Sequence, residues 1–131
     1  MKLVATLCAV VAVLVLAPAA RADHRYGPVF TIDPEHAAAL IARGGVAPID
    51  LRPESEFQTG RLPGARSLPL ATLAARTDEL PPDGVILLYG DGPNERLFRA
   101  YHFVRARRAG AVYLLDGGID GWRRAGNPVE R

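Results

Sequence analysis

Residues 49–70 read IDLRPESEFQTGRLPGARSLPL, and this stretch is the most informative part of the chain for the fold. It begins at the end of a short apolar run of strand length, which carries Asp50 and is followed by Arg52. Charged groups at the end of a buried strand need a partner, so we expect an ion pair that braces neighbouring segments, in preference to a catalytic role. Further along, Gly60 and Gly64 predict a tight turn, because glycine adopts backbone angles that other residues resist.

The segments outside this stretch alternate between helical and strand patterns. Residues 31–45 predict a helix with Asp33 as its N-cap. Residues 85–89 and 111–115 are continuous apolar runs, as in strands buried on both faces of a parallel sheet, and residues 96–109 carry apolar residues at helical spacing. The remaining predicted elements are a strand (46–51), a helical turn (52–60), an extended piece (65–70), a short helix (70–77) and a closing helix (117–126). This alternation predicts an α/β domain with a mainly parallel sheet.

Two segments resemble the signatures of the rhodanese-like domain family: the stretch quoted above and residues 112–130, VYLLDGGIDGWRRAGNPVE. The matching residues are Asp50, Arg52, Glu56, Phe57, Gly60, Pro63, Gly64 and Ala65 in the first, and Asp116, Gly117, Gly118, Trp122, Gly126 and Pro128 in the second. The resemblance implies a three-layer α/β/α domain over residues 30–131, with a mainly parallel five-stranded sheet. Arg61 departs from the pattern, since the family often has histidine there, and we expect it at the surface or rim.

The loop after residues 85–89 departs from the family where the chemistry should be. The resemblance implies a nucleophilic cysteine directly after an aromatic residue, cradled by backbone N–H groups at a helix N-terminus. Here Tyr89 holds the aromatic position, so the cysteine position falls on Gly90. Glu95 stands where the family commonly has arginine, with Arg96 beside it. No persulfide can form at Gly90, and a phosphatase of this fold would lack the same cysteine, so no catalytic residue is assigned.

Two compatible interpretations of this loop remain open. Its residues are Gly90, Asp91, Gly92, Pro93, Asn94, Glu95 and Arg96. The residues expected to support it are Asp50, Arg52 and Arg61. As a binding site, the loop would take a neutral or cationic ligand or a partner's segment, because the charges of Asp91 and Glu95 repel an anionic donor. Alternatively, Asp91, Asn94 and Glu95 cap the following helix, with Pro93 near its first turn.

The N-terminal segment predicts export. Residues 3–17 form an almost continuous apolar run, and residues 20–22 (Ala-Arg-Ala) suit a signal peptidase. We expect a signal peptide at residues 1–22, a lead-in at residues 23–29, and a periplasmic or secreted domain; an uncleaved anchor is the alternative. The apolar run is shorter than the roughly 18–20 residues of a membrane span, so no span is expected after cleavage. Cys8 lies inside the run, which disfavours a lipoprotein, and cleavage would leave no cysteine.

Composition narrows the classes of partner. The chain has 16 basic and 14 acidic residues, but Lys2 and Arg21 would leave with the signal peptide, so no nucleic-acid partner is implied. The arginines of residues 96–109 predict a solvated helix face, with a polyanion site as the weaker alternative. The three histidines are His24, His36 and His102. Their spacing matches no metal-ligand motif, so we expect neither a metal nor another cofactor, and we expect a monomer.

Two hypotheses of function follow from these observations. The first is an exported, non-catalytic rhodanese-like domain that acts as a binding or accessory module for an unknown protein partner or small ligand. The second keeps a sulfurtransferase-type role, with the reactive sulfur supplied by a partner protein or by a small thiol. The chain has no cysteine after Cys8, so its own mature residues supply no sulfur nucleophile. Whether it is an enzyme therefore depends on a reactive sulfur that comes from another molecule.

Overall fold

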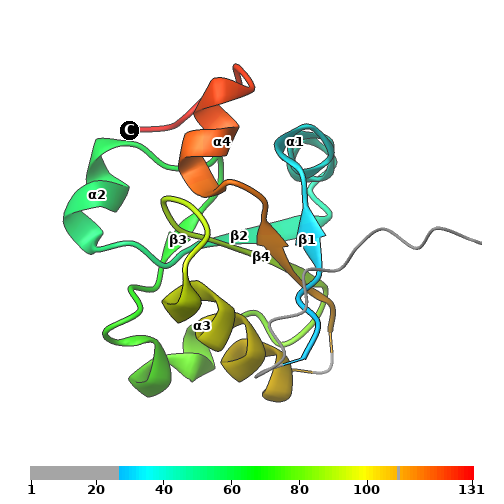
Figure 1. Cartoon of the computed structure of the whole chain (residues 1–131), viewed down its shortest axis with the longest axis vertical. Coiled ribbons are helices and arrows are strands. Elements are labelled where there is room, and N and C mark those ends of the chain that lie inside the picture. Colours follow the sequence, from blue (N-terminus) through cyan, green and yellow to red (C-terminus); the bar gives the residue numbers. More distant parts are fainter. Residues whose placement is uncertain (1–26, 109) are drawn as a thin grey trace, which may run out of the picture.

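The fold is built on a parallel sheet, seen in a computed structural model that describes residues 27–108 and 110–131 (Figure 1). The strands are β1 (Thr31–Ile32), β2 (Val46–Asp50), β3 (Arg66–Ser67), β4 (Val85–Tyr89) and β5 (Val112–Leu115). Within the described residues they form one five-stranded sheet in the order β1-β5-β4-β2-β3, with every pairing parallel. The predicted α/β fold with a parallel sheet is confirmed. The expected signal peptide and most of the lead-in lie outside the described residues.

Helices cover both faces of the sheet (Figure 1). They are α1 (Pro34–Ala42), α2 (Glu54–Thr59), α3 (Glu95–Ala106) and α4 (Gly118–Arg124). The start of α1 is the one predicted from the sequence, because the Asp33 side chain accepts a hydrogen bond from the His36 backbone N–H at 2.9 Å. None of the helices in the described part of the chain is long and apolar enough to cross a membrane.

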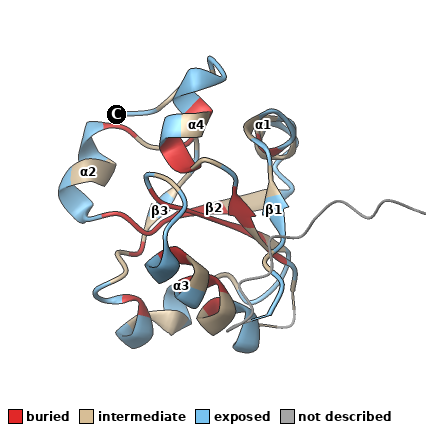
Figure 2. Ribbon diagram, viewed as in Figure 1, coloured by how far each residue is buried: buried red, intermediate tan, exposed pale blue. Residues whose placement is uncertain are grey.

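The core consists of two apolar clusters, one on each face of the sheet, and β4 contributes to both. Figure 2 shows that buried residues lie in the sheet and on α3 and α4. Ile86 and Leu88 pack in the cluster formed with α3, whereas Leu87 and Tyr89 pack in the cluster formed with α1 and α4. Since successive side chains of a strand point to opposite faces, a strand covered on both sides is apolar throughout. Trp122 of α4 is buried in the second cluster.

Two elements differ from the predictions. The prediction of a short helix over residues 70–77 is wrong. The chain forms two 3₁₀ turns in this region, Leu73–Ala75 and Thr77–Glu79. Leu73 is the buried residue of these turns, so no apolar stripe stabilises a continuous α-helix. The sequence does not predict the strand β1, because it has only two residues and lies at the edge of the sheet. It is joined to β5 beside it, where the Leu114 N–H donates a hydrogen bond to the Phe30 carbonyl at 2.9 Å.

The turn after α2 confirms one glycine prediction and corrects the other. Gly64 has φ +73°, a left-handed conformation that favours glycine. Gly60 is extended, with φ 166°, so its backbone angle is one that any residue adopts. A Cβ atom at this position would lie 2.9 Å from the guanidinium of Arg123, but that group is the end of a flexible, exposed side chain and can move aside, so space does not require glycine here either.

Candidate functional site

The loop between β4 and α3 is anchored to the start of α4. The carbonyl oxygen of buried Gly90 accepts a hydrogen bond from the Ile119 N–H at 2.8 Å, and that of Asp91 accepts one from the Asp120 N–H at 3.3 Å. Gly118, with φ +60°, lies so close that a Cβ atom on it would be 2.5 Å from the Asp91 carbonyl oxygen. The two backbones therefore pack directly on each other, which fixes the loop at the C-terminal edge of the sheet.

The other end of the loop is fixed by a helix cap. The Asn94 side chain accepts a hydrogen bond from the Leu97 N–H at 3.0 Å, which confirms the capping prediction for this residue. Glu95 lies in the first turn of α3, where a negative charge is favourable, and its carboxylate pairs with Arg99 at 3.1 Å. Asp91 is exposed and its side chain does not cap the helix. The negative charge of Glu95 is thus partly offset by Arg99, whereas Asp91 has no ion pair within the described residues.

The place where a side chain at position 90 would stand is already filled. A Cβ atom built on Gly90 would lie 2.8 and 3.0 Å from the two Cδ atoms of Leu97, and all three nearest neighbours of that position belong to Leu97. Leu97 is itself buried, at 3% exposure, in the cluster under the sheet. Gly90 does not have a positive φ, so steric contact rather than backbone strain limits substitution here.

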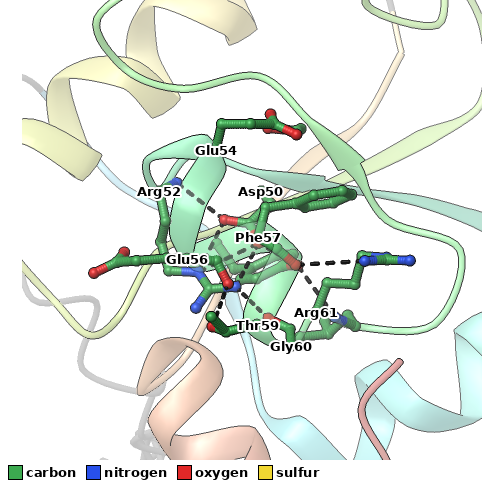
Figure 3. A network of polar contacts seen from close by, with 11 residues as sticks. Asp50, Arg52, Glu54, Glu56, Phe57, Thr59, Gly60 and Arg61 are labelled. Carbon is green, nitrogen blue, oxygen red and sulfur yellow. Dashed lines mark hydrogen bonds and ion pairs between the residues drawn. The ribbon is translucent and has the colours of Figure 1, made fainter. Parts of the chain in front are cut away.

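Beneath the loop, Asp50 and Arg52 form the buried ion pair that the sequence predicts (Figure 3). Arg52 donates from Nη2 to Asp50 Oδ2 at 2.7 Å and from Nε to Oδ1 at 3.0 Å, and it also donates to the Gly60 carbonyl at 2.6 Å. Asp50 is fully buried and Arg52 is 5% exposed. Burial alone would lower the pKa of Arg52, but the hydrogen bonds and charge of Asp50 outweigh it and raise that pKa.

Tyr89 connects this ion pair to the loop. Its hydroxyl donates to Asp50 Oδ2 at 2.8 Å and accepts from the Leu62 N–H at 3.1 Å, and Gly90 follows it directly. Burial, together with the negative charge of Asp50, raises the pKa of Tyr89, so the hydroxyl stays protonated and can donate. The network thus ties the end of β2, the turn at Leu62 and the start of the loop to one another.

We expect Tyr89→Phe to lower the free energy of unfolding by about 1–3 kcal/mol, because it leaves the buried Leu62 N–H without its acceptor. Urea unfolding followed by the fluorescence of Trp122, the single tryptophan, measures this change. Tyr113→Phe is the matched control, since Tyr113 is half-buried in β5 and no hydrogen bond of its hydroxyl occurs within the described residues. Equal effects of the two substitutions would contradict the role given to the Tyr89 hydroxyl.

Arg61 lies at the rim, as expected, and not in the loop. Its guanidinium stacks over the Phe57 ring, 4.7 Å from the centroid, and its backbone pairs with Glu130 through N–H···O distances of 3.0 and 2.8 Å. Through this pairing the end of the chain is bound to the turn after α2. Within the described residues Arg61 makes no hydrogen bond or ion pair with the loop, whereas Asp50, paired with Arg52, is hydrogen-bonded to Tyr89, the residue before Gly90.

The histidines are not brought together in the described part of the chain. His24 lies outside it, and His36 is exposed on α1, where its Nδ1 lies 2.6 Å from an Asp33 carboxylate oxygen. His102 is on α3. No group of three or more His, Cys, Asp or Glu side chains that could hold a metal ion occurs among the residues described.

The family model of the rhodanese-like domain matches residues 33–125, which is most of the chain. The chain belongs to the rhodanese-like domain family. Both signature segments and the loop between them lie inside or next to the matched range. The family pattern has its nucleophile at the position that corresponds to Gly90. The glycine at this position is therefore the main departure of this member from the family, and Leu97 packs against it.

Named relatives differ in length and in kind. An HTH-type transcriptional regulator of Mycobacterium tuberculosis is 43% identical over 98 residues, covering 71% of this chain and 42% of the regulator. A sulfurtransferase of Allochromatium vinosum is 31% identical over 81 residues, covering 62% of this chain and 75% of that protein. This chain thus spans less than half of the regulator's length.

Solved structures agree on the fold. A rhodanese-related protein from Thermoplasma volcanium superposes with a TM-score of 0.70 at 20% identity, covering 77% of this chain and 97% of that one. A thiosulfate sulfurtransferase from Pseudomonas aeruginosa gives a TM-score of 0.70 at 26% identity, covering 81% of this chain and 20% of that one. The predicted three-layer rhodanese-like fold is confirmed by this likeness.

Sequence reasoning missed two residues of the site. From the sequence alone, Tyr89 is assigned only the aromatic position before Gly90, and its hydroxyl is given no role. A tyrosine at the end of an apolar strand does indicate a buried hydroxyl that needs a hydrogen-bond partner. Leu97 was read as one of the apolar positions of a helix. No pattern in the sequence shows that its side chain occupies the space beside Gly90, because that contact depends on how α3 packs under the loop.

Proposed function

We propose that this rhodanese-like domain is a non-catalytic binding or accessory module, and that its ligand or partner binds at the loop of residues 90–96. The observation that carries the proposal is the state of position 90. The residue there is a buried glycine, and the space for a side chain is filled by Leu97. Cys8 is the single cysteine of the chain, so no other residue offers a sulfur nucleophile.

The electrostatics of the loop support the same proposal. Sulfur transfer from thiosulfate requires a site that attracts a dianion and stabilises a thiolate. Here Asp91 is an exposed carboxylate at the loop, and Arg52, the buried cation near it, is already engaged by Asp50 and the Gly60 carbonyl. The loop therefore suits a neutral or cationic ligand better than an anionic one.

We expect no thiosulfate-to-cyanide sulfurtransferase activity from the purified chain above a protein-free control. The Cys8→Ser variant removes the single thiol and is the matched comparison, because any activity that it keeps cannot come from a cysteine. Turnover of about 1 s⁻¹ or more, the ordinary range of enzymes, in this variant would refute the proposal. Addition of one sulfur to the variant, seen by intact-mass measurement, would refute it equally.

The alternative is a sulfurtransferase-type function with the sulfur supplied from outside, which the named sulfurtransferase relative from Allochromatium vinosum favours. Its test adds a small thiol such as glutathione to thiosulfate, with and without the Cys8→Ser chain. Faster persulfide formation with the protein present would favour this alternative over a pure binding role. An unchanged rate leaves the binding role as the better account.

We further propose that the chain is exported and that residues 1–22 are removed. The support is the apolar run with Ala20-Arg21-Ala22 behind it. Intact-mass measurement of the protein from the envelope fraction is expected to give a chain that begins at Asp23. A species that retains Met1 to Ala22 would show an uncleaved anchor instead. The matched comparison is an Ala20→Arg/Ala22→Arg variant, in which cleavage is expected to fail.

A further inference from the structure

A pocket of about 470 Å³ lies against the same loop, on the side of β1 and β5. Its lining residues are Val29, Thr31, Gly92, Pro93, Leu97, Phe98, Leu114, Leu115, Asp116 and Gly117. The segments that meet there are the lead into β1, the end of β5, the loop and the first turns of α3. This volume is in the range of sites that bind small organic molecules.

The described walls of the pocket combine apolar side chains with polar groups and one charged side chain. Leu97, Leu114 and Leu115 are buried side chains of the core, and Phe98 adds an aromatic ring. Among the described residues of the lining, Asp116, exposed at the end of β5, is the single charged one. A carboxylate beside an apolar wall favours a ligand with a positive group attached to an apolar body, because each part then meets its complement.

The charged side chains around the pocket are consistent with a preference for a cationic ligand. Asp91, Glu95 and Asp120 are exposed on the adjoining loop and at the start of α4, although Glu95 is paired with Arg99. The guanidinium of Arg124 approaches Gly117 from α4, but it forms no ion pair with Asp116 within the described residues. Arg96 is exposed on α3 and does not line the pocket.

We propose that this pocket binds a small organic cation, an ammonium group on an aromatic or aliphatic body, with the ammonium at Asp116 and the body against Leu97, Phe98 and Leu114. The proposal rests on the proposed binding function of the loop and names the ligand class. Leu97 is the wall that the pocket shares with the space beside Gly90. A ligand in the pocket is therefore held next to the loop without reaching a reactive group. The ring of Phe98 offers a face on which a cation is also favoured.

Three probes that share an indole body and differ in charge test the ligand class: tryptamine (cationic), tryptophol (neutral) and indole acetate (anionic). Each is titrated into the full chain at low salt while backbone amide NMR signals are followed. We expect tryptamine to bind about fivefold or more tightly than tryptophol, with indole acetate weakest, and the differences to shrink at high salt. The signals that shift should include those of Gly92, Leu97 and Gly117.

Two substitutions of equal charge separate the pocket from the general acidity of this edge. Asp116→Asn is expected to remove the preference for tryptamine, whereas Asp120→Asn, on α4 and outside the lining, should keep it. Thr31→Trp fills the pocket from the exposed edge of β1 and should abolish binding of all three probes while the circular dichroism spectrum is unchanged.

Equal affinity for the three probes, shifted signals confined to another part of the domain, or equal effects of Asp116→Asn and Asp120→Asn would overturn the proposal. Binding of a peptide with tryptophan and lysine, but not of tryptamine, would overturn it as well, since the occupant would then be a protein segment. None of these outcomes decides whether the chain transfers sulfur, which the thiosulfate measurement on the Cys8→Ser variant tests separately.

Discussion

Replacing Asp50 by alanine is expected to destabilise the domain by about 3–5 kcal/mol, because it leaves the buried guanidinium of Arg52 without its counter-charge. Three hydrogen bonds from the Arg52 side chain and one from the Tyr89 hydroxyl end on the Asp50 carboxylate. Arg52 would keep the Gly60 carbonyl as an acceptor, but that oxygen carries no full charge. Urea unfolding followed by Trp122 fluorescence measures the loss, which is a large share of the stability of a domain of this size.

The control for this prediction removes both charges together. Asp50→Leu/Arg52→Met replaces the pair by apolar side chains and is expected to unfold at a higher urea concentration than Asp50→Ala, because no buried charge is left alone. Arg99→Ala breaks the exposed pair with Glu95 and should change stability by less than about 1 kcal/mol. If Asp50→Ala costs no more than Arg99→Ala, the buried pair does not have the structural role described here.

The sheet and its main helices could be predicted because their signals are local. A continuous apolar run such as residues 85–89 reports a strand covered on both faces, and Asp33 followed by Pro34 reports a helix start. The elements that failed have weak local signals. The strand β1 has two residues, and the segment 70–77 has a helical composition but buries too little on one side to form an α-helix.

The candidate site divides in the same way. The pairing of Asp50 with Arg52 follows from charge at the end of an apolar strand, so the sequence predicts it. The packing of Leu97 beside Gly90, and the contact of Gly118 with the Asp91 carbonyl, join segments that are distant in the chain or on different elements. Such contacts are set by tertiary packing, so neither the spacing of apolar residues nor the composition of the sequence predicts them.

The contact between Leu97 and Gly90 predicts a pair of substitutions that compensate each other. Gly90→Cys alone should cost about 1–3 kcal/mol, since the new Cβ atom meets the Leu97 methyl groups. Leu97→Ala alone should cost about 2–5 kcal/mol through the cavity it leaves. The double variant should cost less than the sum by about 1–3 kcal/mol, because the cysteine fills the space that the leucine vacates. Leu114→Ala, at an equally buried leucine, is the control and should be additive with Gly90→Cys.

The same variants decide how far the loop is from a reactive site. In a Cys8→Ser background the introduced thiol is the only one, and we expect iodoacetamide to alkylate it at least about tenfold faster after Leu97→Ala than in Gly90→Cys alone, where Leu97 packs against it. Adding Glu95→Arg should lower the pKa of the thiol and raise the rate further, more at low salt than at high salt. That gain should be modest, because Arg99 already offsets part of the Glu95 charge. If Gly90→Cys alone reacts as fast as the double variant and also turns over thiosulfate, Leu97 does not block the position, and the missing sulfur atom by itself accounts for the expected lack of sulfur transfer.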